Sequence, residues 1–425
     1  MTEVPATPRA EDGGVADRTA TAAASPRRRG FGAGFWFVAY AFLVVMASAT
    51  LPSPLYGLYR LRDGLSALMI TVIYAIFAVG TIATLLCVGS IAARVGRRGV
   101  MLGAVVAMMA AVGVLAAWQA LPGLLIGRLV TGVAVGLAAG SAITYLIELR
   151  LRSDPGASIV GPRTIGTSVS VGALGIGPLI AGCIAQWTSH PLTLPYLVFL
   201  GLGASALVAV GAAPETSVRA TPSARGARTP RRARLPVPAA AGTMSAFAAS
   251  GLFAGLSGLI LATTLGHPSH ALAGVTLFIV FTCGVASQLA TARLHAAAVL
   301  AIGTASMLCG LVCLVVAVRL SSPSLALFLV GGGLIGAGAG AVFKGTTGIV
   351  LEASEPQDRL AMTSALLVVL FTGLSVPIVG AGIALDQGAS TPNTVLGFAV
   401  LVALGVSASG WAMLRPRPAA SRPAT

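Results

Sequence analysis

This chain contains few charged residues. Charged residues make up 9% of its 425 residues and hydrophobic residues 56%, whereas soluble domains usually contain about one-quarter charged residues. None of its 12 aspartates and glutamates, and none of its 4 histidines, lies in the middle of an apolar stretch. The chain also lacks a nucleotide-binding loop and the usual motifs around a catalytic nucleophile. These absences exclude a soluble enzyme, and we do not expect this protein to be an enzyme.

Residues suited to metal or thiol chemistry are equally scarce. The 5 cysteines all lie in apolar stretches, and no two of them form a Cys-x-x-Cys pair. His267 and His270 are three residues apart, but no acidic residue or thiol accompanies them. A lasting zinc site usually needs three or four protein ligands. We therefore expect no metal site and no cofactor.

Long apolar stretches are what the chain has in abundance. Crossing the hydrocarbon core of a bilayer takes about 20 apolar residues, and stretches of this length follow one another from about Phe35 to Leu414. The expected spans are 34–59, 66–93, 99–120, 122–149, 164–188, 194–213, 240–263, 271–293, 296–319, 324–350, 361–385 and 393–414. The sequence therefore predicts an all-α membrane protein with twelve transmembrane helices.

A polar segment divides these spans six and six. Residues 214–239 are rich in Pro, Ala and Arg and have no apolar period, which is typical of a linker. We expect one six-helix bundle over residues 34–213 and a second over 240–414. Residues 1–33 cannot bury a core and are expected to be a disordered tail, and residues 415–425 form a second tail.

The basic residues predict the orientation of the chain in the membrane. If the amino terminus is cytoplasmic, 22 of the 27 lysines and arginines fall on the cytoplasmic side, because positive loops resist translocation. Both termini are then cytoplasmic. The net charge of +15 is explained by a basic rim facing anionic lipid, so no nucleic-acid partner is expected. One lysine among so many arginines, with abundant Ala and Gly, is typical of a GC-rich bacterial genome, which favours a bacterial plasma membrane.

Two of the spans repeat one another. Residues 122–149 and 324–350 both carry glycines four apart and both are followed closely by a glutamate, Glu148 or Glu352. Alignment of the two glutamates superposes Gly132 with Gly336, Gly136 with Gly340, and Gly140 with Lys344. Each half then continues into an arginine, three further residues and a Thr-Ser pair. The repeat indicates duplication of one bundle, and the glycine stripe is expected to serve close helix packing.

An arginine-rich turn follows the second span and resembles a known signature. The segment GSIAARVGRR matches the cytoplasmic motif of the major facilitator superfamily at Gly89, Arg94, Gly96, Arg97 and Arg98. Ala93 stands where the family has an aspartate. The resemblance implies that this turn braces a cytoplasmic gate, with Glu148 as the partner of Arg94 or Arg97. The alternative is that the arginines only anchor the topology.

Other motifs of the same family occur in the expected order. GRLVTG, with Arg128, is similar to the family's intramembrane arginine motif, and ALGIGPLIAG, with Gly177, Pro178 and Gly182, resembles its antiporter motif. LPSPLY at 51–56 and Pro-Glu-Thr at 214–216 also fit, so the resemblance covers nearly all of residues 34–414. It implies two bundles around a cavity that opens alternately to each side of the membrane.

The resemblance also implies a function. We expect a secondary active transporter that works as a monomer in the lipid bilayer and exports small amphipathic organic compounds in exchange for protons. A sugar or metabolite transporter of the same fold, or a transport-inactive membrane sensor, are the alternatives.

Two basic residues lie inside expected spans and are the candidates for substrate binding or coupling. Arg128 lies about six residues into its span, where a charge usually faces a cavity or a partner. Lys344, the only lysine, has no mid-membrane carboxylate to pair with. It could bind an anionic substrate or carry the coupling proton. For both residues the alternative is a side chain that snorkels toward the headgroups.

Overall fold

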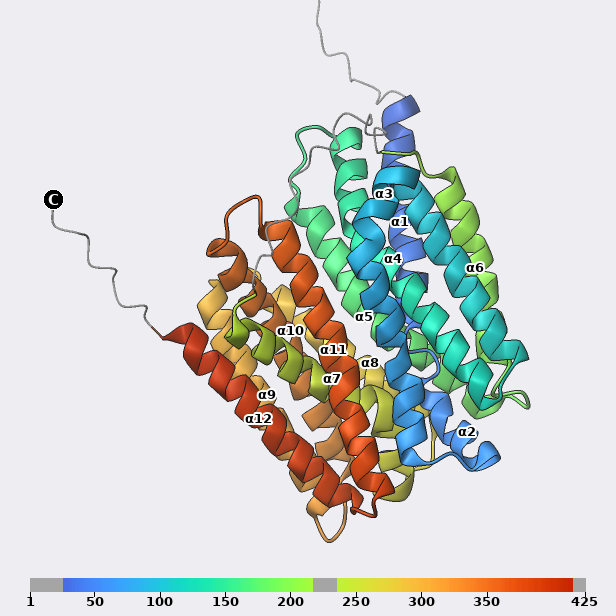
Figure 1. The fold of residues 1–425 in the computed structure, drawn as a ribbon, viewed down its shortest axis with the longest axis vertical. Helices are drawn as coiled ribbons and strands as arrows, with labels where there is room; N and C mark the ends of the chain where they lie inside the picture. Colours follow the sequence, from blue (N-terminus) through green and yellow to red (C-terminus); the bar gives the residue numbers. More distant parts are fainter. Residues whose placement is uncertain (1–25, 217–234, 416–425) are drawn as a thin grey trace, which may run out of the picture.

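The computed structural model describes residues 26–216 and 235–415, and within these ranges all regular structure is helical (Figure 1). Residues 1–25 and 416–425 of the predicted tails and most of the predicted linker lie outside the described residues. Residues 26–33, which were expected to be part of the disordered tail, instead form the first turns of α1. The elements are α1 Pro26–Ser48, the 3₁₀ turn η1 Ser53–Leu55, α2 Tyr56–Asp63, α3 Ala67–Ala117, α4 Leu121–Ser153, α5 Val160–Trp187, α6 Leu194–Ala212, α7 Val237–Thr263, α8 His270–Ala290, α9 Ala296–Arg319, α10 Leu325–Glu352, α11 Arg359–Asp386 and α12 Thr391–Leu414.

The number of membrane-spanning segments differs from the twelve expected. Eleven segments of the described chain are long and apolar enough to cross a membrane, the first of them combining α1, η1 and α2. The spans expected at 66–93 and 99–120 are joined in the single 51-residue helix α3. A straight helix of that length would measure about 77 Å, more than twice the thickness of the hydrocarbon core. The difference in number therefore comes from this one long helix.

The helix α3 is interrupted at Gly96. This residue has φ 80° and ψ 171°, a conformation that L-residues with a side chain rarely adopt. Arg62, just before α3, donates a hydrogen bond of 2.7 Å to the side chain of Gln119, just after it. The two ends of α3 therefore lie together, and the chain reverses direction at Gly96. We call the end of the molecule with this reversal the Gly96 end, and the opposite end, with Tyr56–Asp63, the α2 end.

The helices form two groups that lie side by side (Figure 1). One group contains α1 to α6 and the other contains α7 to α12. In the first, α4 packs against α3 and α1; in the second, α10 packs against α9 and α8. We refer to the groups as the N bundle and the C bundle.

The repeated glycines hold equivalent helix pairs together. A Cβ atom placed on Gly132 of α4 would lie 2.0 Å from the carbonyl oxygen of Phe77 in α3. A Cβ atom on Gly336 of α10 would lie 1.8 Å from the carbonyl oxygen of Val280 in α8. Only glycine permits such an approach, and close packing is the main attraction between helices in lipid. The stripe thus serves packing, and both bundles use it in the same way.

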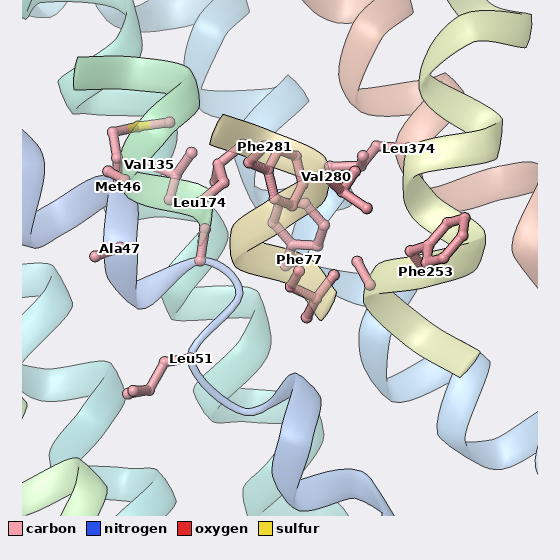
Figure 2. Packing of buried hydrophobic residues seen from close by; sticks show 14 of the residues in the cluster. Met46, Ala47, Leu51, Phe77, Val135, Leu174, Phe253, Val280, Phe281 and Leu374 are labelled. Carbon is pink, nitrogen blue, oxygen red and sulfur yellow. The ribbon is translucent and has the colours of Figure 1, made fainter. Parts of the chain in front are cut away.

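A break between α1 and η1 is tied to α5 by one hydrogen bond. Pro178 of α5 has no N–H group, so the carbonyl of Leu174, four residues earlier, has no donor within its own helix. The hydroxyl of Thr50, in the break, donates to this oxygen over 2.6 Å. Figure 2 shows Leu174 beside the chain that connects Ala47 to Leu51. The break in α1 therefore supplies the donor that the proline removes from α5.

Replacement of Thr50 by valine should destabilise the protein. The variant keeps the shape of the side chain but leaves the buried carbonyl of Leu174 without a donor, which costs about 1–3 kcal/mol. Thermal unfolding of the purified protein in detergent should show a lower midpoint for Thr50→Val, whereas Thr50→Ser, which keeps the hydroxyl, should stay close to the parent. Equal midpoints for the valine variant and the parent would show that this hydrogen bond contributes nothing.

Candidate functional site

A cavity lies between the two bundles at the Gly96 end. Its volume is about 870 Å³, within the range of sites that hold small organic molecules. On the N-bundle side its wall comes from the first turns of α5, and on the C-bundle side from α8 to α11. The polar residues of the wall are Arg163, Thr164, Thr167, Ser168, Gln288, His295, Lys344, Thr347, Glu352, Arg359 and Thr363.

Lys344 is part of this wall. Its Nζ donates a hydrogen bond of 2.7 Å to the carbonyl oxygen of Gln288, near the end of α8, and one of 3.3 Å to the hydroxyl of Thr291. The side chain thus crosses from α10 to α8. Of the two basic residues expected to bind substrate or carry the coupling charge, Lys344 is the one that the structure places at a cavity.

The position of Lys344 in the repeat sets it apart from its counterpart in the N bundle. Along α10, Gly336 meets Val280 and Gly340 meets Gly284 of α8, and the next step of this series joins Lys344 to Gln288. At the equivalent step in the N bundle, a Cβ atom on Gly140 would lie 2.5 Å from the side chain of Val88. A lysine side chain cannot fit into so close a contact, and Lys344 instead reaches across to α8 beside the cavity.

Arg128 lies elsewhere, fully buried in the N bundle. Its guanidinium donates to the carbonyl oxygen of Ala49 in the α1 break, and to those of Ile73 at 3.4 Å and Tyr74 at 3.1 Å in α3. It also lies 4.7 Å from the ring centre of Phe77. Arg128 was expected to bind substrate or to take part in coupling. Its guanidinium instead contacts three carbonyl oxygens and joins the α1 break to α3.

The arginine-rich turn makes its contacts within the N bundle. Arg97 Nε lies 3.5 Å from Glu148 Oε1, with both side chains partly exposed, and Glu148 also accepts a hydrogen bond from the hydroxyl of Thr216. Arg94 is exposed. Of the two expected partners for Glu148, the structure pairs it with Arg97. Because both residues belong to one bundle, their ion pair does not itself join the bundles.

Glu215, which follows α6, binds this turn in a way that the sequence did not predict. Its two carboxylate oxygens accept hydrogen bonds of 3.1 Å from the backbone N–H groups of Arg97 and Arg98. These N–H groups begin the second half of α3, directly after Gly96, and have no acceptor in their own helix. A carboxylate is a favourable cap at that position because of the helix dipole. A glutamate directly after the sixth span was the signal, but its distant partner could not be inferred.

At the α2 end the two bundles are in close contact along α5 and α8. A Cβ atom on Gly182 of α5 would lie 2.3 Å from the carbonyl oxygen of His270, and one on Gly274 of α8 would lie 2.4 Å from the carbonyl oxygen of Pro178. Gly177 faces the other way, where a Cβ atom would lie 1.9 Å from the carbonyl oxygen of Ala47 in α1. The residues of the predicted antiporter motif therefore place α5 between its own bundle and the other one. We call this contact the α5–α8 seam.

A second contact, between α3 and α11, supports the seam. A Cβ atom on Gly382 of α11 would lie 2.1 Å from the hydroxyl oxygen of Thr71 in α3. Further along, the rings of Phe77 and Phe371 meet edge to face with centroids 6.1 Å apart. Figure 2 shows Phe77 close to Val280 of α8, with apolar side chains of both bundles around them. The bundles are thus packed together at the α2 end and separated by the cavity at the Gly96 end.

One side chain carries three hydrogen bonds across the seam. Gln186 Oε1, near the end of α5, accepts from the N–H groups of His270 at 2.9 Å and Ala271 at 3.4 Å, and from the hydroxyl of Ser269 at 3.1 Å. His270 is the first residue of α8, so Gln186 caps the amino terminus of a helix in the other bundle. The sequence gives no signal for this contact, because a glutamine at the end of a span is ordinary.

Loss of the Gln186 cap should loosen the α2 end. Gln186→Leu leaves the N–H groups of α8 without this acceptor, whereas Gln186→Glu keeps the acceptor and adds a favourable charge at the helix amino terminus. A cysteine at the buried position Ile70, between the bundles at the α2 end, reports opening through its reactivity with a thiol reagent in a background without native cysteines.

The leucine variant should react roughly fivefold faster than the parent, which corresponds to about 1 kcal/mol for one net hydrogen bond. The glutamate variant should react no faster than the parent. Equal rates in all three proteins would show that Gln186 does not restrain the seam.

Comparison with known proteins agrees with this architecture. A sequence model of the Major Facilitator Superfamily matches residues 38–318, whereas no curated protein sequence matches the chain. Crystal structures of the nucleoside transporter NupG and of a point mutant of it are similar, each with a TM-score of 0.66. They are 12% and 9% identical to this chain, cover 91% and 90% of it, and are themselves covered completely. At such identities the likeness shows the fold alone. The family match over most of the chain shows that this protein belongs to the major facilitator superfamily.

Proposed function

We propose that this protein is a secondary active transporter that moves a small organic solute by alternating access. The observation that carries the proposal is the contrast between its two ends. A cavity of about 870 Å³ opens between the bundles at the Gly96 end. At the α2 end a second hollow, of about 850 Å³, lies between Arg60–Ala67 and Leu385–Thr391, but the bundles are in close backbone contact along the α5–α8 seam. We infer that a solute reaches the first cavity from the Gly96 end, which is one of the two states that alternating access requires.

The proposed topology has twelve membrane crossings. The parts of α3 before and after Gly96 count as two of them. The Gly96 end is then cytoplasmic, as are both termini, because the arginines of the turn and of the loops after α4 and α10 lie at this end. The structure then corresponds to a state open to the cytoplasm. The cavity is enclosed by helices of one chain, in keeping with a monomer.

We further propose that transport is export in exchange for protons. The resemblance of the α5 motif to the motif of antiporters supports export by exchange. The position of this motif in the α5–α8 seam gives α5 a part in the conformational change. Since Gly177 contacts α1 and Gly182 contacts α8, a tilt of α5 changes the contact within the N bundle and the contact between bundles together. Apolar wall residues such as Val160, Leu289 and Phe343 suit an amphipathic compound.

A second candidate is a transporter of polar metabolites such as sugars. The observation in its favour is the number of hydroxyl and amide groups in the cavity wall, among them Thr164, Thr167 and Gln288. The similar fold of a nucleoside transporter agrees with it. The third alternative, a transport-inactive sensor, would keep the cavity but move no solute.

Transport by the purified protein in liposomes tests these proposals. A panel of amphipathic compounds, sugars and nucleosides is assayed with and without an imposed pH gradient. We expect gradient-dependent movement of at least one amphipathic compound, and at least a tenfold loss of it in Ser168→Trp, since the indole would fill the cavity. Val312→Trp, at an exposed position on α9, is the matched control and should transport at the parent rate.

The outcomes separate the candidates. Flux of sugars or nucleosides alone would favour the metabolite transporter, and flux that ignores the pH gradient would contradict proton coupling. If no compound moves under either condition, the sensor alternative holds. Equal loss in both tryptophan variants would show that the cavity is not the route.

A further inference from the structure

We propose that the cavity recognises an anionic group, a carboxylate or a phosphate, on its solute, and that Lys344 is the centre of the recognition site. This inference rests on the proposed transport function and names the chemical class of the solute.

One N–H donor of Lys344 has no acceptor among the described residues, and no carboxylate of these residues lies within ion-pair distance of it. An ammonium group has three N–H donors, and the structure gives two of them acceptors, the carbonyl of Gln288 and the hydroxyl of Thr291. The ion pairs of the described chain involve Arg62 and Arg97, not Lys344. Both acceptors of Lys344 are neutral, so its charge is held in place without being neutralised by the protein.

Two neutral polar groups of the same wall have no hydrogen-bond partner in the part of the chain that the structure describes. They are Gln288 Nε2, which can only donate, and Thr347 Oγ1, and both are buried from solvent. Buried polar groups are nearly always hydrogen-bonded in proteins, because an unsatisfied one is costly. An anion can accept from an ammonium, an amide N–H and a hydroxyl together, and its charge would also balance that of Lys344.

The charges around the cavity have mainly one sign. Besides Lys344, the titratable residues of its wall are Arg163 from α5, His295 at the start of α9, Glu352 from α10 and Arg359 from α11. Together with Lys344 these make three lysine or arginine side chains and one carboxylate. Positive walls of this kind attract negative solutes and hold cations off. The balance of charge therefore favours an anionic solute over a cationic one.

The duplication explains why arginines face the cavity from both bundles. Arg163 and Arg359 occupy equivalent places in the two halves, each four residues before a Thr-Ser pair. Both line the cavity, Arg163 from the first turn of α5 and Arg359 from the first turn of α11. Guanidinium groups suit carboxylate and phosphate oxygens. An anion held by Lys344 would thus lie between arginines of opposite bundles and could draw them together when it binds.

Binding of matched anionic and neutral compounds to the purified protein tests the inference. The probes are benzoate, benzyl phosphate and the neutral benzamide and benzyl alcohol, titrated by calorimetry at constant ionic strength. At least one anion should bind more tightly than its neutral counterpart. Lys344→Met should weaken it by roughly tenfold or more, as for loss of a charged hydrogen bond, while Lys344→Arg should stay within roughly threefold. Val312→Met is the control for a methionine on an exposed helix surface.

Several results would overturn the inference: no binding of either anion, equal binding of the neutral compounds, or unchanged anion binding in Lys344→Met. The transport assay distinguishes this failure from that of the proposed function. Flux of neutral compounds only, at equal rates in the parent and Lys344→Met, would remove the anion site and keep the transporter. Lys344-dependent anion binding without any flux would keep the site and remove transport.

Discussion

Close approach of backbones at glycine is the interaction on which the rest of this structure depends. In a bilayer apolar side chains gain little by leaving lipid for one another, so helices associate through close van der Waals contact between small residues. Gly132 and Gly336 bring α4 onto α3 and α10 onto α8 in this way. Gly182 and Gly274 do the same between the two bundles. One kind of contact thus holds each bundle together and also closes the α2 end.

Lys344 is the exception to this glycine pattern, and it lies at the cavity. Where the N bundle has Gly140 packed on Val88, the C bundle has Lys344, whose side chain spans the gap to α8. A single departure from the repeat therefore places a charge at the cavity wall. The asymmetry between otherwise equivalent helices suits a transporter, in which one bundle offers a binding group to a solute that the other bundle then covers.

The sequence predicted those features that depend on one helix at a time. Apolar length predicted the helices, and glycine spacing predicted the stripes on α4 and α10. Gly96 and the arginines around it predicted a turn, which the chain makes. They did not predict that α3 would continue on both sides of this turn, which gives eleven membrane-spanning segments in place of twelve. Lys344 was predicted as a site residue because it is a single charge within an apolar segment.

The pairing of Glu148 with an arginine of the turn was predicted through the family resemblance, but contacts between a side chain and a distant backbone group could not be predicted. Arg128 was expected to face an anion, yet its donors are taken by carbonyls freed at the α1 break and by carbonyls of α3. Glu215 and Gln186 cap helices far away in the sequence, and nothing in their own neighbourhood marks them as caps. Thr50 compensates for Pro178 across two helices. In each case the partner is a backbone group, which every residue has and no sequence motif distinguishes.

The central claim is the proposal of alternating access, in which opening the seam at the α2 end closes the cavity at the Gly96 end. Electron-spin distance measurements in lipid nanodiscs test it most directly, with labels on Leu61 and Gln387 at the α2 end and, in a second protein, on Val95 and Ala353 at the Gly96 end, all exposed. Gly182→Leu forces the seam apart, since even a Cβ atom at Gly182 would lie 2.3 Å from the carbonyl oxygen of His270. The account predicts that this substitution lengthens the distance at the α2 end and shortens that at the Gly96 end. A longer distance at the α2 end with an unchanged distance at the Gly96 end would contradict it.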